Sequence, residues 1–262
     1  MKKILFIVWV IILSSCKDKK FNIFTLKDDM ELGAQMDAEI RSNPFEYPIL
    51  NRNSYPDAYN HIERIRNKLL ASDDLKHKDI FNWQVTIIHN DNVLNAFCTP
   101  GGYMYFYTGI IKYLDNEAQF AGVMAHEMAH ADKRHVTQTL TTIYSVQVLL
   151  SFALGKNPSQ LAQIVADMAL GLGTLKFSRT HEYEADEMSV KYLADTDYHP
   201  KSIAGFFEKI ESSAAPKTPE FLSTHPNPGN RLDNINNVWV GIGSPSGNAD
   251  TTNYMLFKQS LP

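Results

Sequence analysis

The spacing of apolar residues along the chain predicts that most of it is helical. Between residues 26 and 41, and again between 56 and 71, apolar side chains recur every three or four positions with charged residues between them. This pattern is typical of a helix that packs one face against a core. Three further segments also predict helices: 116–130, 181–194 and 201–212.

Two other segments have the patterns of strands. Residues 81–88 alternate apolar with polar side chains, and residues 103–107 are rich in aromatic side chains. The segment 95–102 lies between them and ends in a proline and two glycines. This composition predicts a turn that leads into the second strand.

Length and composition are those of an ordinary globular protein. The 262 residues are 44% hydrophobic and 21% charged, which allows one large core. We therefore expect one α+β domain over residues 28–240, mostly helical with a small sheet, and a turn-rich C-terminal tail over 241–262. The net charge of -4 and the pI of about 6.1 exclude a general nucleic-acid surface, so no nucleic-acid partner is expected.

The N-terminus has the pattern of a bacterial lipoprotein signal. Lys2 and Lys3 precede an apolar run that ends shortly before Cys16. We expect residues 1–15 to be removed as a signal peptide, and residues 16–27 to form a lipidated cysteine with a tether to the membrane. The alternative is a short uncleaved anchor, but the run is much shorter than the roughly 20 residues that span a bilayer.

The residue after the lipidated cysteine bears on localisation. Many inner-membrane lipoproteins of Gram-negative bacteria carry an aspartate there, whereas this chain has Lys17. We therefore expect a protein of the bacterial cell envelope, held at the outer membrane and facing the periplasm.

Two mostly apolar segments, 143–154 and 161–175, are too short and too interrupted by polar residues to span a membrane. We expect them to be core or lid helices. The alternative is a hairpin that leans on the membrane or gates the site.

The most specific motif is His-Glu-x-x-His at residues 126–130, in a helix that is otherwise almost entirely apolar. Because a helix turns once per 3.6 residues, His126 and His130 share a face and can bind one metal ion. Glu127 lies about 100° further round, close enough to act on a metal-activated water without binding the metal. This pattern is the signature of a zincin.

Zinc needs a third protein ligand, and the segment 178–186 supplies two candidates. Glu182 and Asp186 are four residues apart and share a helical face. One can bind the metal while the other accepts a hydrogen bond from a ligand imidazole, and the spacing allows either assignment. His135 is turned about 140° from His130 on a continuous helix, so we interpret it as a structural residue.

These motifs together resemble those of a known family. The His-Glu-x-x-His helix and the later Ser-Arg-x-x-Glu-Tyr-x-Ala-Asp segment are similar to motifs of the HtpX, BepA and CAAX prenyl endopeptidase family of zinc metallopeptidases. Asn95-Ala-Phe97 with Pro100-Gly101-Gly102, and His225-Pro226 with Arg231, match its soluble bacterial lipoprotein branch. The resemblance covers about residues 28–240 and implies a gluzincin-like zincin fold with a small sheet beside the active-site helix.

The resemblance implies a single zinc ion bound by His126, His130 and Glu182. It also implies that Glu127 is the catalytic acid/base. Asp186 matches the aspartate that supports the ligand helix.

Two later residues also match the family pattern. Arg231 is expected to support the ligands together with Asp186. His225 falls where the family carries a His-Pro near the site. It could act in catalysis by steadying the oxyanion, or it could occupy the open zinc position in a resting state.

The strand at 103–107 leads directly into the metal helix. We therefore expect Gly101, Gly102, Tyr103 and Met104 to border the cleft, where the strand could pair with an extended peptide substrate. The alternative is an aromatic core strand that touches no substrate.

The expected function is a lipid-anchored zinc metalloendopeptidase for protein quality control. It would hydrolyse peptide bonds of damaged, unfolded or misassembled cell-envelope proteins, with a zinc-activated water and Glu127 as acid/base. The alternative, from a different class, is a zinc-stabilised periplasmic chaperone or assembly factor whose site is normally plugged, for instance by His225.

Overall fold

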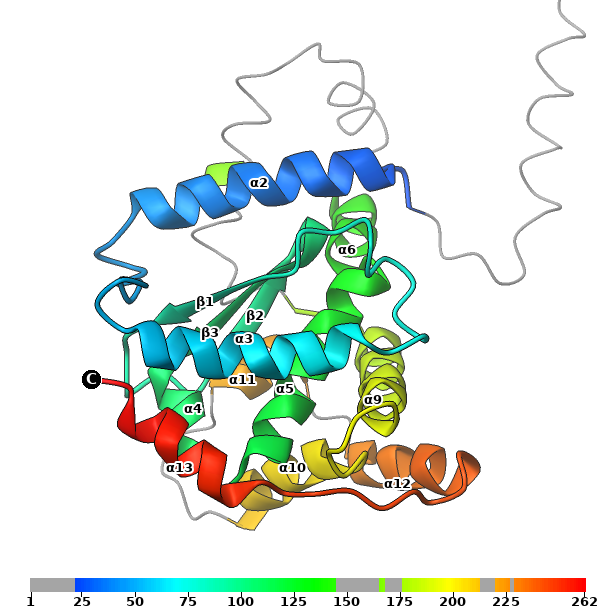
Figure 1. Ribbon diagram of the computed structural model, residues 1–262. Helices are drawn as coiled ribbons and strands as arrows, with labels where there is room; N and C mark the ends of the chain where they lie inside the picture. The colour runs from blue at the N-terminus through cyan, green and yellow to red at the C-terminus, as the bar shows by residue number, and fades with distance from the viewer. Residues whose placement is uncertain (1–21, 145–164, 168–175, 213–219, 227–228) are drawn as a thin grey trace, which may run out of the picture.

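The computed structural model describes residues 22–144, 165–167, 176–212, 220–226 and 229–262 (Figure 1). The predicted signal peptide over 1–15 and the predicted lipidation site Cys16 lie outside the described residues. Most of the apolar segments 143–154 and 161–175 also lies outside them. In the described part of the chain, no helix combines the length and the apolar character that crossing a membrane requires.

The domain contains a three-stranded sheet. Its strands β1 (Gln84–Ile88), β2 (Ala96–Thr99) and β3 (Tyr103–Tyr107) are arranged in the order β1-β3-β2. β3 is parallel to β1 and antiparallel to β2. Both predicted strands are confirmed, although β1 begins at Gln84 rather than at residue 81. The turn predicted over 95–102 is wrong in its first half, because β2 forms there.

Helices cover both faces of this sheet, as Figure 1 shows. α2 (Leu26–Ser42) contacts β2 from one side, and α5 (Glu117–Asp132) contacts β2 and β3 from the other. α3 (Pro56–Leu70) packs against β1 and α5. The fold is therefore mostly helical with a small sheet beside α5, as the sequence predicts.

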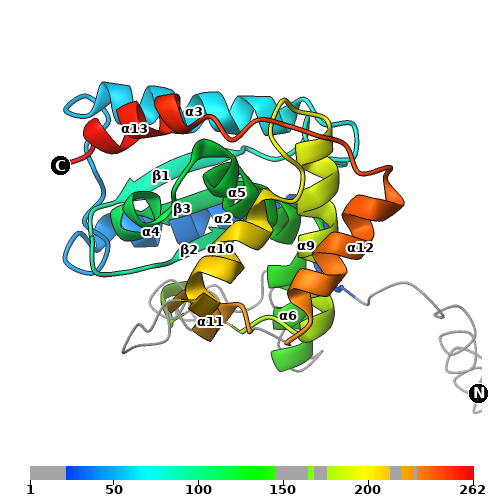
Figure 2. The ribbon, with the colours of Figure 1, turned by 90° about the horizontal axis from the view of Figure 1, so that it is seen from below.

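Several of the later helices pack around α5. α9 (Arg179–Ala194) and α10 (Ser202–Ser212) pack directly against it, and α12 (Arg231–Gly241) packs against both of them (Figure 2). Every residue of α5 except Gln119 is buried, so this helix is the centre of the core. The other elements of the described chain are η1 (Pro100–Gly102), α4 (Thr108–Tyr113), α6 (His135–Ile143), α11 (Glu220–Thr224) and α13 (Thr251–Gln259).

Polar side chains cap the two helices that carry the predicted metal ligands. At the start of α5, Asn116 accepts a hydrogen bond from the backbone N–H of Gln119 at 2.9 Å and is therefore the N-cap of this helix. The side chain of Gln119 accepts from the backbone N–H of Asp115 instead of completing a capping box. Ser178 caps α9 in the same way, by accepting from the backbone N–H of His181.

The segment predicted as a turn-rich tail contains a helix. α13 packs against α3 and α5, and its Tyr254 and Phe257 are fully buried. These two side chains are three residues apart and therefore share a helical face. The prediction of a tail is wrong for residues 251–259, because burial of these two aromatic rings stabilises a helix that the composition alone does not indicate.

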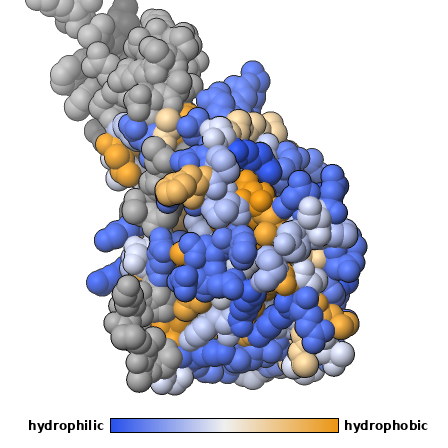
Figure 3. Space-filling model, turned by 90° about the vertical axis from the view of Figure 1, so that its left-hand side faces the viewer, coloured by the Kyte–Doolittle hydropathy of each residue, from blue (hydrophilic) through white to orange (hydrophobic). Residues whose placement is uncertain are grey.

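The face of the molecule shown in Figure 3 is largely hydrophilic in its described residues, with hydrophobic side chains scattered over it. Exposed large hydrophobic residues in the described chain include Phe45, Met255 and Leu256. Single exposed hydrophobic residues are normal for a globular protein.

Candidate active site

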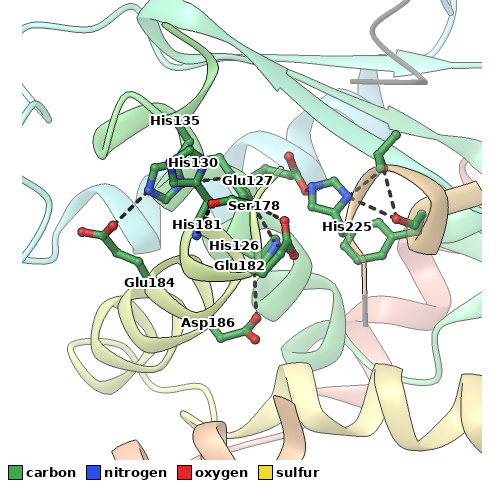
Figure 4. A network of polar contacts seen from close by, with 12 residues as sticks. His126, Glu127, His130, His135, Ser178, His181, Glu182, Glu184, Asp186 and His225 are labelled. Carbon is green, nitrogen blue, oxygen red and sulfur yellow. Dashed lines mark hydrogen bonds and ion pairs between the residues drawn. The ribbon is translucent and has the colours of Figure 1, made fainter. Parts of the chain in front are cut away.

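His126 and His130 project from the same side of α5 into the interior (Figure 4). Their Nε2 atoms lie 3.0 Å apart, and both side chains are fully buried. The two imidazoles therefore share one helical face, as their spacing of four residues predicts.

Helix α9 brings a carboxylate to these histidines. Glu182 Oε2 lies 3.4 Å from His126 Nε2, and Glu182 Oε1 lies 3.4 Å from His130 Nε2. The Glu182 side chain is fully buried as well. Two helices that are far apart in the sequence thus bring three potential ligand side chains together.

His225 lies directly after α11 and faces the same point. Its Nε2 lies 3.3 Å from Glu127 Oε1, and its Nδ1 contacts Thr224 Oγ1 at 2.8 Å. Its ring stacks on Phe221 with 4.2 Å between the centroids, which restricts its orientation. Ligand atoms of four side chains lie within 4.8 Å of one another: His126, His130, Glu182 and His225.

The donor atoms of this cluster fit a metal ion. His126 Nδ1 lies 3.0 Å from the Asp186 carboxylate, so Nδ1 carries the hydrogen and Nε2 presents a lone pair to the cluster. Both oxygens of Glu182 and Nε2 of His225 are buried without a hydrogen-bond partner among the described residues. Such groups normally have partners, and a divalent cation would serve all of them. Imidazole and carboxylate are ligands that zinc prefers.

A buried ion pair supports the cluster from behind. Arg231 Nε and Nη2 donate to the Asp186 carboxylate at 2.7 and 2.5 Å, and Nη1 lies 3.0 Å from Glu182 Oε2. Arg231 is 1% exposed, and its guanidinium lies over the Phe207 ring. Asp186 thus contacts both Arg231 and His126.

Burial and neighbouring charges shift the protonation of the cluster. Burial raises the pKa of Glu182, but its neighbours, among them His126 and Arg231, outweigh burial and lower it, so the carboxyl is ionised. Burial lowers the pKa of His225 well below its usual value, so its ring is neutral. Burial also raises the pKa of Glu127 to about 7. Glu127 can therefore take up and release a proton near neutral pH.

The cluster favours positive charge at His126. Burial lowers the pKa of this ring, but its contacts with Asp186 and Glu182 outweigh burial and raise the pKa to about 9. A proton and a metal ion would compete for the same Nε2 lone pair. The carboxylates that attract the proton would equally attract a divalent cation.

The structure brings two further residues to the site that the sequence analysis did not place there. His135 Nδ1 lies 3.0 Å from His130 Nδ1, and His135 Nε2 lies 3.1 Å from Glu184 Oε2. His135 is not one of the four residues whose ligand atoms lie together, which agrees with its interpretation as a structural residue. The only sequence signal for its contact with the site was a third histidine close to the motif.

The two glycines predicted to bind substrate have a packing role in the structure. Gly101 and Gly102 have φ of 74° and 90°, a backbone conformation that favours glycine. A Cβ on Gly101 would lie 3.0 Å from Met30 Cα, and a Cβ on Gly102 would lie 2.9 Å from the Trp83 backbone nitrogen. Close approach of the chain to itself therefore accounts for both glycines.

The other two residues predicted to bind substrate begin β3. Tyr103 and Met104 are buried, and their strand is paired with β1 on one side and β2 on the other. The prediction that β3 pairs with an extended peptide is therefore wrong, because both edges of its backbone are already occupied. The aromatic core strand considered as the alternative is the arrangement observed.

Comparisons with known proteins agree with this geometry. Residues 40–238 match the sequence profile described as "Peptidase family M48". The chain is 30% identical over 220 residues to a putative beta-barrel assembly-enhancing protease of Vibrio cholerae, covering 79% of this chain and 44% of that protein. It is 33% identical over 162 residues to the beta-barrel assembly-enhancing protease of Escherichia coli, covering 58% and 33%. It is also 31% identical over 150 residues to the mitochondrial metalloendopeptidase OMA1 of Arabidopsis thaliana, covering 57% and 30%.

The chain spans less than half the length of these three relatives. The family match nevertheless covers most of the chain and includes all four residues of the cluster. Peptidases of this family depend on zinc, and the cluster supplies donor atoms that suit it. The expected resemblance to BepA-type metallopeptidases is confirmed: the chain belongs to peptidase family M48, a family of metallopeptidases.

Proposed function

We propose that this protein is a lipid-anchored zinc metalloendopeptidase that binds one zinc ion through His126, His130 and Glu182. The observation that carries the proposal is the convergence of these three buried side chains from α5 and α9, with Glu127 beside them. Their donor atoms would fill three ligand positions of a catalytic zinc site. Asp186 holds His126 in the tautomer that binding requires.

The proposed chemistry is hydrolysis of a peptide bond. When bound, zinc supplies polarisation of the scissile carbonyl and acidification of the attacking water. Glu127 accepts a proton from water and delivers it to the leaving amine, which its pKa of about 7 allows in both directions. Asp186 and Arg231 keep the ligand helix in place during this cycle through their buried ion pair.

The proposed substrates are unfolded or misassembled proteins of the bacterial cell envelope. This part of the proposal is supported by the beta-barrel assembly-enhancing proteases of Vibrio cholerae and Escherichia coli, whose similarity covers 79% and 58% of this chain. The location is supported by the signal-like residues 1–15 and by Cys16, which would carry the lipid on the periplasmic side of the outer membrane. Cys16→Ser should release the protein from the membrane fraction of cells.

The enzymatic proposal is tested with Glu127→Gln. This variant should bind zinc as the wild type does but degrade casein about 10²–10⁴-fold more slowly, because the acid/base is lost. Glu187→Gln is the matched control, since Glu187 lies on α9 and pairs with Lys191 away from the cluster. Metal analysis and casein degradation with and without a chelator are the measurements. Wild-type activity in Glu127→Gln would refute the proposed mechanism.

A second candidate function is favoured by the position of His225. Its neutral Nε2 faces the cluster and could occupy the fourth ligand position, which would leave a zinc-stabilised chaperone or assembly factor with a plugged site. His225→Ala separates the two functions. Faster degradation of an unfolded protein by this variant would support a peptidase with a plugged resting state. Zinc binding with no degradation by either form would support the chaperone.

A further inference from the structure

A chain of polar contacts leads away from the cluster on the far side of His130 (Figure 4). His130 Nε2 faces His126 and Glu182, while its Nδ1 lies 3.0 Å from His135 Nδ1. The other ring nitrogen of His135, Nε2, lies 3.1 Å from Glu184 Oε2. Both histidines are fully buried, whereas the Glu184 side chain is 32% exposed.

With Glu184 ionised and His135 neutral, these contacts allow one arrangement of the hydrogens. An ionised carboxylate can only accept a hydrogen bond, so Glu184 requires the hydrogen of a neutral His135 to be on Nε2. His135 Nδ1 then carries a lone pair and can only accept. His130 must therefore donate its Nδ1–H to His135, which leaves the lone pair of His130 Nε2 directed at the cluster.

The backbone explains how His135 comes to face His130. α5 ends at Asp132, and Arg134 has a left-handed conformation with φ 62° before α6 begins at His135. Arg134 donates hydrogen bonds to the Asp29 side chain and to the carbonyl of Phe24, which hold the turn. On an uninterrupted helix the two side chains would diverge by about 140°. The break between the helices turns the His135 ring back toward the cluster.

Ring stacking restricts the planes of both imidazoles. The His181 ring stacks on His135 with 4.3 Å between centroids and 12° between planes. Phe177 stacks on His130 with 3.9 Å between centroids. His130 is therefore held both by the hydrogen bond and by the ring above it.

We propose that His135, held by Glu184, is a positioning residue that directs His130 Nε2 toward the metal ion. The inference rests on the proposed function, since it requires His130 to be a zinc ligand. The two ligand histidines are then held differently. His126 donates directly to the Asp186 carboxylate, whereas His130 donates to the His135 imidazole, which relays the effect of Glu184.

The test compares the zinc affinities of purified variants by competition with a chromophoric chelator. His135→Leu removes the acceptor and should weaken zinc binding by about 10–100-fold. In His135→Asn, the Asn Oδ1 takes the place of the ring Nδ1, so the variant keeps an acceptor for His130 and should lose less than about 10-fold. Glu184→Ala should also weaken binding, and an unchanged affinity would exclude a role for Glu184. His89→Leu, at an exposed histidine, is the matched control and should bind as the wild type does.

A second measurement separates positioning from a general structural role. In the zinc-loaded wild type, ¹⁵N NMR should show a scalar coupling between His130 Nδ1 and His135 Nδ1 across their hydrogen bond. No such coupling in a folded, zinc-loaded protein would refute the inference, even if His135→Leu failed to fold. Wild-type protein that binds no zinc would refute the proposed function instead. Wild-type binding together with equal binding by His135→Leu would refute only this inference.

Discussion

Replacing Arg231 by methionine tests the electrostatic balance of the site. One guanidinium serves two buried carboxylates: Asp186 at 2.5 and 2.7 Å, and Glu182 at 3.0 Å. Methionine replaces the aliphatic part of the arginine side chain and has no charge, so Arg231→Met removes the cation together with its contact over the Phe207 ring. In the metal-free protein, two carboxylates would then be buried with His126 as the cation that remains next to them.

The size of the effect follows from burial. Removing one partner of a buried ion pair typically costs about 3–5 kcal/mol, because the other charge is left without compensation. Arg231 and both carboxylates are at most 1% exposed, so solvent screens these charges little. We expect metal-free Arg231→Met to lose about 3–5 kcal/mol of unfolding free energy, out of the roughly 5–15 kcal/mol that domains possess. The loss should be smaller with zinc present, because the metal ion compensates the same carboxylates.

Urea unfolding followed by tryptophan fluorescence measures the loss of unfolding free energy, with chelator for the metal-free protein and with excess zinc for the loaded one. The double variant Asp186→Leu/Arg231→Met removes both charges of the pair. Without metal it should be more stable than Arg231→Met alone, because leucine at position 186 leaves no unpaired charge buried there. A metal-free Arg231→Met protein within about 1 kcal/mol of wild type would refute this reasoning. So would an equal loss with and without zinc.

Two further predictions concern the fold. Gly33→Ala would place a Cβ 1.9 Å from the carbonyl oxygen of Pro100, and urea unfolding should show a loss of about 1–3 kcal/mol of unfolding free energy. A Cβ at Gly241 would meet no neighbouring atom within 4 Å, so Gly241→Ala should change the unfolding free energy by less than about 0.5 kcal/mol. Burial and contact with Asp37 raise the pKa of Tyr105. Above about pH 10 the folded state therefore keeps the phenol proton that the unfolded state releases. The free energy of unfolding then falls as the pH rises. Tyr105→Phe should reduce this slope by about 1.4 kcal/mol per pH unit between about pH 10.5 and 12, and an unchanged slope would contradict it.

Local rules were sufficient where a feature depends on neighbouring residues. Helical periodicity placed His126 and His130 on one face, within a segment predicted as a helix from residue 116. The position of Glu182 depends on how α9 packs against α5, which no local pattern contains. The spacing left Glu182 and Asp186 as equal candidates, and family resemblance was needed to choose between them.

The sequence analysis was wrong where burial overrode local composition. The segment around β2 ends in Pro100-Gly101-Gly102 and predicted a turn, yet residues 96–99 are fully enclosed and pair with β3. The turn-rich C-terminal segment contains α13 because Tyr254 and Phe257 fill the core beside α3 and α5. In both cases the deciding contacts come from elements distant in the sequence, so the composition of the segment could not reveal them.

His135 shows how a correct geometric rule can lead to an incomplete interpretation. An angle of about 140° between positions 130 and 135 holds only if the helix continues, and it excluded His135 as a contact of the site on that assumption. Arg134 breaks the helix in a left-handed conformation that is uncommon for residues other than glycine, and nothing in the sequence around it indicates the break. The conformation is held from outside, by Asp29 and the carbonyl of Phe24 near the start of α2. One residue inside the predicted membrane tether, Phe24, and one just after it, Asp29, therefore hold the turn that brings His135 to His130.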